Sequence, residues 1–312
     1  MIRLKKVTET ACSMKTIFSN EKFVQQLREA LEVSRDIRLT PKPQLVVVCV
    51  DGAAVQIGEI IQTTRCTLPI ITNMSDELPA CVNQDTLVVC VSYSGNAPEV
   101  LQCAQEAVKM KTRLMIVTSG GKLLAFAQAQ SIVRFQLPVD RTWSIGLTLM
   151  PLLMLLVRNH CVLLSKEEVE EGIRALVQSQ VREKAAEIAL QIGDRTPCVY
   201  AGNQLAASVW CVKESLSRVA KVIAHVNTFP AMLCTDAVSK QSKSYVLLVR
   251  DECESRLVQT LLDQYKNKLR EQKVPCTEVM LRGKKKWNKI LLSMILGEFI
   301  AYFLAKRQGI DV

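Results

Sequence analysis

Two kinds of hydrophobic pattern alternate along the chain. Short continuous runs rich in Val, Leu and Ile, such as Leu45–Val50 (LVVVCV) and Thr86–Ser92 (TLVVCVS), predict buried strands. Between them lie stretches with helical spacing, such as Pro98–Met110, which has Pro at its start, where a missing N–H costs nothing. This alternation is typical of parallel sheets with helices on both faces, so we expect an α/β fold.

The alternation occurs twice. The first series has further strands at Leu68–Thr72, Arg113–Ser119 and Ser131–Leu137, and the second has strands at Cys198–Ala201, Ser244–Val249 and Thr277–Leu281. A polar helical stretch, Lys166–Gln191, separates the two series and carries i,i+4 charge pairs. We expect two lobes, each a parallel sheet flanked by helices in three αβα layers. The expected boundaries are a helical leader at 1–40, a first lobe at 41–162, a connector at 163–194 and a second lobe at 195–312.

Composition favours a soluble globular protein, with 49% hydrophobic and 22% charged residues. Ile145–Val157 has no charge but is too short to span a bilayer, and Glu298 interrupts the apolar stretch Ile290–Ala305. The N-terminus lacks the apolar stretch of a signal peptide. We therefore expect a cytoplasmic protein that does not bind membranes.

The charge of the chain favours anionic ligands without choosing among them. Lys and Arg number 40 against 30 Asp and Glu, a formal charge of +10. The densest basic run, Arg282–Lys286, is short enough to be a solvated loop. The leader before the first strand shows one convincing helix, too little for a helix-turn-helix domain, so a nucleic-acid partner is disfavoured.

Cysteine is frequent but does not form a metal-binding pattern. The chain has 12 Cys without a C-x-x-C pair and only 2 His, which disfavours a zinc site. Reduced, buried thiols and the disulfides of a hyperthermophile's cytoplasm both fit this composition. We expect no metal.

The segment Ser92-Tyr93-Ser94-Gly95-Asn96 carries the strongest chemical signal. It follows the strongest predicted strand and directly precedes a helix, so hydroxyls and backbone N–H groups converge where the helix dipole favours an anion. The turn Thr118-Ser119-Gly120-Gly121 ends the next strand and is expected beside it. Ser and Gly also simply cap helices and form βα turns, and spacing alone leaves both interpretations open.

The segments VVCVSYSGN, PEVLQCAQEA and RLMIVTSGG resemble the sugar isomerase (SIS) domain. The C-terminal segment Leu296–Asp311 is similar to the closing helix of the archaeal-type bifunctional phosphoglucose/phosphomannose isomerase family. The resemblance covers residues 45–312. It implies two flavodoxin-like SIS lobes, a homodimer, no cofactor or metal, and a phosphorylated sugar as ligand.

The resemblance also implies a reaction and a set of site residues. The family interconverts aldose and ketose 6-phosphates through an enediol, which requires a base, a ring-opening acid/base and a cation to steady the enediolate. The phosphate would lie against the Ser/Gly loop and the neighbouring turn: Ser92, Ser94, Gly95, Asn96, Thr118 and Ser119. The family's arginine falls at or next to Arg141, which alternatively pairs with Asp140 at the surface.

Several family positions carry other residues in this chain. The base glutamate aligns with Arg218, which cannot accept a proton, so Glu214, one helical turn earlier, is the candidate substitute. Glu214 alternatively serves only as the i,i+4 partner of Arg218. The ring-opening histidine aligns with Cys234. Ala97 and Ala54 replace hydroxyl residues of the phosphate site, and Asp51 would place a negative charge near the phosphate. The family's terminal lysine has no counterpart before the chain ends at Val312.

Two hypotheses follow. The chain is a divergent isomerase of hexose 6-phosphates in glycolysis or gluconeogenesis, with Arg141 and Glu214 as catalytic residues. Alternatively, it is a catalytically degenerate SIS protein that binds phosphosugars or acts as a dimeric regulatory partner, because a fold can outlive its chemistry.

Overall fold

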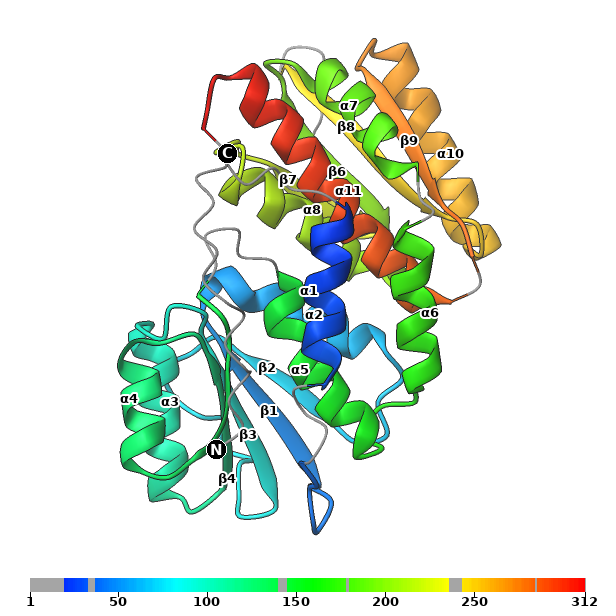
Figure 1. Ribbon diagram of the computed structural model, residues 1–312. Helices are drawn as coiled ribbons and strands as arrows, with labels where there is room; N and C mark the ends of the chain where they lie inside the picture. Colours follow the sequence, from blue (N-terminus) through cyan, green and yellow to red (C-terminus); the bar gives the residue numbers. More distant parts are fainter. Residues whose placement is uncertain are drawn as a thin grey trace. The chain divides into compact units, whose positions relative to one another are not determined.

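The computed structural model (Figure 1) describes residues 20–32, 37–139, 145–177, 180–235, 243–283 and 285–311. The chain divides into two compact units, the first containing Glu21–Glu168 and the second Val169–Val312. The boundary lies within helix α6, which spans Lys166–Val177. Each unit is built around its own sheet.

The first unit contains a five-stranded parallel sheet. Its strands are β1 (Leu45–Val50), β2 (Ile70–Asn73), β3 (Thr86–Val91), β4 (Arg113–Thr118) and β5 (Val133–Gln136). Their spatial order is β2-β1-β3-β4-β5, the flavodoxin-like order. The fully buried run of β3 explains its uninterrupted apolar sequence, since both faces of the sheet are covered.

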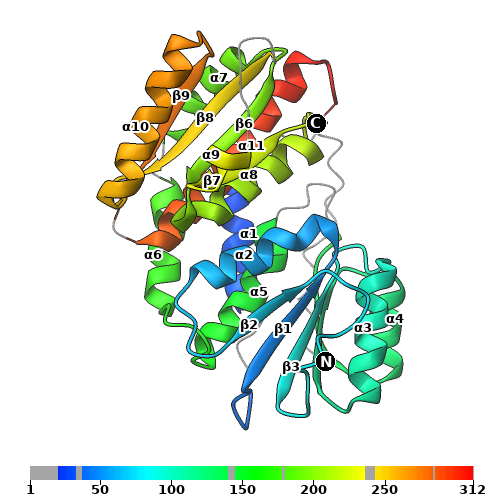
Figure 2. The same cartoon turned by 180° about the vertical axis from the view of Figure 1, so that it is seen from behind.

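Helices cover both faces of the first sheet. The helices are α1 (Asn20–Glu32), α2 (Val55–Thr63), α3 (Pro98–Lys109), α4 (Gly121–Ala129) and α5 (Ile145–Arg158), with a short 3-10 turn at Gly52–Ala54. Side chains of α3 and α4 share a core cluster with alternate residues of β1, β3 and β4. Both views show α3 and α4 together on one face, with α2 and α5 on the other (Figures 1 and 2).

The second unit contains a four-stranded parallel sheet. Its strands are β6 (Thr196–Gly202), β7 (His225–Phe229), β8 (Ser244–Asp251) and β9 (Cys276–Leu281), in the order β7-β6-β8-β9. The order is that of the first sheet without a fifth strand. The α/β fold with two parallel sheets is therefore confirmed, although β7 was not predicted from the sequence.

Helices cover both faces of the second sheet. Besides most of α6, the second unit contains α7 (Val181–Ile192), α8 (Ala206–Arg218), α9 (Met232–Thr235), α10 (Arg256–Glu271) and α11 (Lys286–Arg307). Helix α11 packs against α7 and α8 on one face, and α9 and α10 share a core cluster with the other face.

Helix α11 is the one described helix that is long and apolar enough to cross a membrane by length and composition. However, 83% of its apolar window is buried within the protein. It is therefore a core helix of the second unit.

Candidate functional site

The parallel register of the first sheet brings three loops together at one edge. Val50 pairs with Val91 and Val91 with Val117, so β1, β3 and β4 end side by side. The next residues are Asp51, Ser92 and Thr118. Ligands of such sheets bind beyond these carboxyl ends, which is where the predicted Ser/Gly loop and the Thr118–Gly121 turn lie.

The Ser92 hydroxyl is wholly buried and already has partners. It donates to Asp51 Oδ2 at 2.9 Å and accepts from the Gly95 amide at 3.3 Å. Asp51 is therefore paired within the loop region. A ligand would meet the Ser92 hydroxyl only if this arrangement changed.

Ser94 and Asn96 are exposed at the tip of the loop. The Asn96 amide donates to the Ser94 hydroxyl at 3.3 Å, and the Asn96 side-chain oxygen accepts from the Lys122 amide at 3.2 Å. The loop therefore caps the start of α4. Because Ser94 is exposed, a ligand can reach it.

Two glycines allow the loop and the turn to approach each other closely. Gly95 has φ +68°, and a Cβ there would lie 1.9 Å from the carbonyl oxygen of Gly120. Gly121 has φ +69°, and its Cβ would lie 2.4 Å from the Ser94 carbonyl oxygen. No side chain fits at either position.

The hydroxyls of Thr118 and Ser119 brace this edge from within. Both residues are buried, and Ser119 Oγ donates to the Tyr93 carbonyl at 2.6 Å while Thr118 Oγ1 donates to the Gly120 carbonyl at 3.0 Å. These contacts position the loop. Their predicted contact with a phosphate stays a prediction.

Helix α3 begins directly after the loop with little local capping. Its N-cap residue Ala97 makes no side-chain hydrogen bond, and Pro98 occupies the first turn. Helix N-terminal amides without a side-chain partner favour an anion. Glu99 in the first turn already supplies some negative charge there.

Of the two candidate catalytic residues, Arg141 and Glu214, the structure describes only Glu214. Arg141 lies outside the described residues, so its predicted role stays a prediction. Glu214 lies on α8 in the second unit, and Arg218 Nε donates to Glu214 Oε1 at 2.6 Å. The i,i+4 pairing is therefore present, but the Glu214 side chain is only 13% exposed rather than at the surface.

A second carboxylate, Glu298 on α11, joins this pair. Glu298 Oε1 accepts from Arg218 Nη2 and, at 2.9 Å, from the Ser215 hydroxyl. We call Glu214, Ser215, Arg218 and Glu298 the carboxylate cluster. Burial raises the pKa of Glu214 to about 7, and the nearby Glu298 acts in the same direction against Arg218. Burial likewise raises the pKa of Glu298.

The role of Glu298 was missed from the sequence, where it interrupted an apolar run and fell within the segment that resembles the closing helix. A lone acid within a hydrophobic helix was the available signal, because a buried carboxylate requires a partner. Its partner could not be named, since Arg218 lies 80 residues away in the chain.

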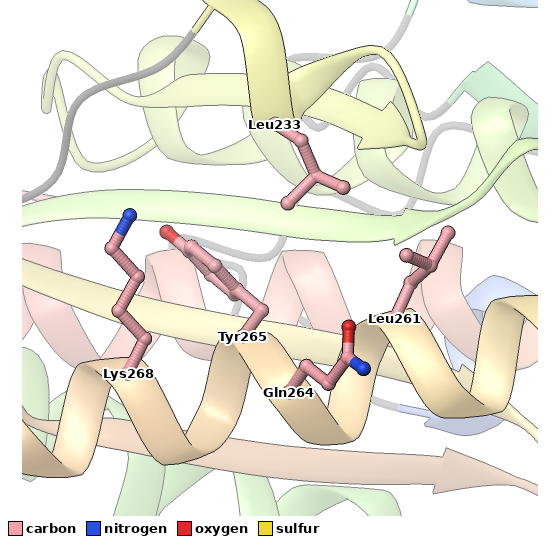
Figure 3. A pocket seen from close by; sticks show the side chains of 5 residues that line it. All are labelled: Leu233, Leu261, Gln264, Tyr265 and Lys268. Atoms are coloured by element: carbon pink, nitrogen blue, oxygen red, sulfur yellow. The ribbon is translucent and has the colours of Figure 1, made fainter.

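The remaining chemistry of the second unit is limited. Cys234 on α9 is exposed. A pocket of about 220 Å³ lies between α9 and α10, with Leu233 facing the α10 side chains (Figure 3). Leu261, Gln264, Tyr265 and Lys268 line its other side. None of these pocket residues was predicted to act in catalysis.

Thiols and metals add no further site. None of the eleven cysteines that the structure describes forms a disulfide. Within the described ranges no group of three or more His, Cys, Asp and Glu is placed to hold a metal ion.

The chain is similar to proteins with SIS domains in both sequence and fold. Residues 181–312 match the family described as "Bacterial phospho-glucose isomerase C-terminal SIS domain". The C-terminal domain of glucosamine-fructose-6-phosphate aminotransferase from Francisella tularensis has the same fold, with a TM-score of 0.67 at 12% identity over 98% of this chain and 99% of that one.

Curated relatives show which kind of SIS protein the chain resembles. A bifunctional phosphoglucose/phosphomannose isomerase from Caldicellulosiruptor bescii is 23% identical, covering 90% of each chain. One from Aquifex aeolicus is 28% identical over 75% of this chain and 74% of its own length. Over most of its length the chain is therefore similar to the bifunctional phosphoglucose/phosphomannose isomerases.

Proposed function

We propose that the protein binds hexose 6-phosphates at the Ser/Gly loop of its first unit and interconverts their aldose and ketose forms. The exposed residues Ser94 and Asn96 at the sheet's carboxyl edge carry this proposal. Hydroxyl, amide and helix-terminal N–H groups converge there on a surface suited to a dianion. The relatives' names supply the sugar and the reaction.

Within this proposal each candidate residue has a role. Ser94, Gly95 and Asn96 contact the phosphate directly, while Ser92, Thr118 and Ser119 hold the loop and contact the phosphate if the loop rearranges.

Glu214 moves the proton between C1 and C2, because a carboxyl whose pKa is near 7 can both accept and return a proton at neutral pH. Arg141 steadies the enediolate.

Binding without turnover is the second candidate function. The position that aligns with the family's base is Arg218, which here is paired with two carboxylates. The position of the ring-opening histidine is Cys234, an exposed thiol. Both departures favour a phosphosugar-binding or regulatory protein.

An isomerase assay beside a binding titration separates these functions. We expect turnover of fructose 6-phosphate at high protein concentration, and stabilisation by 6-phosphogluconate, which cannot isomerise, because a ligand selective for the native state raises its stability. Stabilisation without turnover would support the second function. A protein that showed neither stabilisation nor turnover would refute the site.

The Ser94→Ala variant tests the loop itself. Loss of a hydrogen bond to a charged group predicts roughly 10-fold weaker binding of 6-phosphogluconate. Thr260→Ala, which removes an exposed hydroxyl on α10, is the matched control and should bind as the wild type does. Equal binding by Ser94→Ala would remove the loop from the proposal.

We also propose a soluble, cytoplasmic homodimer that acts in glycolysis or gluconeogenesis, with lobes at 41–162 and 195–312. Helix α5, which is buried from Ile145 to Val157, and the core position of α11 support solubility. Sedimentation equilibrium measures the oligomeric state, and a monomer at micromolar concentration would contradict the dimer.

A further inference from the structure

The carboxylate cluster contains one more carboxylate than its single guanidinium can neutralise. Arg218 uses Nε for Glu214 and Nη2 for Glu298, so its two sides are divided between two acids. All three side chains are largely buried, with exposed fractions of 13% for Glu214, 27% for Arg218 and 8% for Glu298. A pair of ionised carboxylates sharing one cation in such a setting is unfavourable, so one of them tends to hold a proton.

The two carboxylates are not equivalent. Glu298 Oε1 accepts from both the Ser215 hydroxyl and Arg218, and these donors favour its ionised form. Ser215 is itself fixed by a bond to the Cys211 carbonyl at 3.1 Å. Glu214 accepts from Arg218 Nε and is the more exposed of the two carboxylates.

We propose that Glu298 is a positioning residue for Glu214: it occupies the Nη2 side of Arg218, repels the Glu214 carboxylate and so makes Glu214 a stronger base toward the substrate. The inference rests on the role given to Glu214 above. It assigns to the buried acid of α11 an electrostatic task in addition to packing.

Within the described ranges, the charged groups that act on Glu214 are Arg218 and Glu298. Helix α8 contributes Arg218 and the buried thiol Cys211, and α11, which packs against it, contributes Glu298. Strands β6 and β7 also pack on α8 but place no charged group among those that act on Glu214. Close packing of the helices at Gly297, whose Cβ would lie 2.9 Å from Val212 Cα, holds Glu298 against the cluster.

The test is the titration of Glu214 followed by ¹³C-carboxyl NMR, with Glu214→Gln used to assign the signal. In Glu298→Gln the amide oxygen can still accept from Ser215, while Arg218 keeps its bond to Glu214. We expect the Glu214 midpoint to fall by about 1 pH unit. Glu278→Gln, which alters the separate cluster around Arg250, should leave the midpoint unchanged.

An unchanged or raised midpoint in folded Glu298→Gln would overturn the inference. If that variant does not fold, Ser215→Ala replaces it: losing the hydroxyl favours protonated Glu298, and the Glu214 midpoint should again fall. In an active protein the acidic limb of kcat/KM should shift with the midpoint while KM changes little. Absence of turnover in the wild type refutes the proposed reaction but not this inference, because the NMR titration needs no activity.

Discussion

The two units bury polar groups of different kinds. Among the described residues, every buried charged side chain lies in the second unit: Arg250, Asp251, Glu254, Lys289 and Glu298. The buried polar residues of the first unit are uncharged, and several of them, including Ser92, Thr118 and Ser119, lie at the carboxyl edge of its sheet. The hydroxyls at this edge bond to Asp51 and to backbone carbonyls, whereas the buried charged side chains of the second unit form ion pairs.

The difference between the two units is clearest at the loops that follow β3 and β8. β3 and β8 hold the same place in the two sheet orders. β3 continues into Ser92–Asn96, but β8 ends at Asp251 and continues into Glu252 and Glu254. Asp251 accepts from Lys289 and from the Cys253 amide, and Glu254 accepts from Arg250 and from the Asp251 amide. A phosphate at this second edge would meet acids, so the same fold yields one candidate anion site.

Removing Lys289 tests whether the charges of the second unit are committed to each other. Lys289→Met leaves Asp251 buried without its cation, and we expect the free energy of unfolding to fall by about 3–5 kcal/mol. Chemical denaturation measures the change. Lys306→Met on the same helix removes only an exposed cation over Tyr302 and should cost under about 1 kcal/mol. Equal effects of the two variants would contradict the contrast.

The loop of the first unit depends instead on backbone shape. Gly95→Ala combines a left-handed conformation with a clash against the Gly120 carbonyl, and we expect a loss of about 2–4 kcal/mol in unfolding free energy. Gly52→Ala at the same sheet edge meets nothing within 4 Å and is the control. A tolerated Gly95→Ala would mean that the loop adopts another conformation.

The second unit should also dominate the pH dependence of stability. The folded pKa of Glu214, about 7, lies above its ordinary value of 4.5, so the folded state holds the proton after the unfolded state has lost it. The free energy of unfolding should therefore fall as pH rises from about 4.5 to 7 and then level off. Glu214→Gln should reduce this slope and be more stable than the wild type at pH 8 by about 1–3 kcal/mol. Parallel pH profiles for the two proteins would contradict this assignment.

Asp51 is the one acid in the first unit that bonds to a residue of the Ser/Gly loop in the described contacts, and its removal should have the smallest effect. Asp51→Asn keeps an oxygen for the Ser92 hydroxyl but removes a negative charge near the proposed phosphate. We expect binding of 6-phosphogluconate to strengthen by about 3–10-fold, measured by calorimetry at low salt. Asp76→Asn, on an exposed loop, should change little. Weaker binding by Asp51→Asn would show that the carboxylate assists the ligand.

The sequence predicted the central strands well and an edge strand poorly. β1 and β3 are buried on both faces, so their apolar runs stand out from their surroundings. β7 has the sequence HVNTF at a sheet edge, mostly half-buried, and it carries no such signal. The polar helical stretch was expected as one helix, but α6 ends at Val177 and α7 begins at Val181. No Pro or Gly marks that break.

For the site, the sequence indicated where the loop lies but not which groups it pairs with. The alternation of strands and helices along the chain predicts parallel strands, and the carboxyl ends of parallel strands lie at one edge of the sheet. The bond from Ser92 to Asp51 joins residues 41 apart, and the bond from Arg218 to Glu298 joins residues 80 apart. Such pairings arise from tertiary packing, so spacing within one segment cannot specify them.

The most direct test of the sugar-phosphate site is a crystal structure of the protein with 6-phosphogluconate. We predict that the phosphate lies against the Ser94 hydroxyl and the backbone amides between Ser94 and the start of α3. A phosphate bound in the second unit instead, or a loop left empty at saturating ligand, would contradict the account.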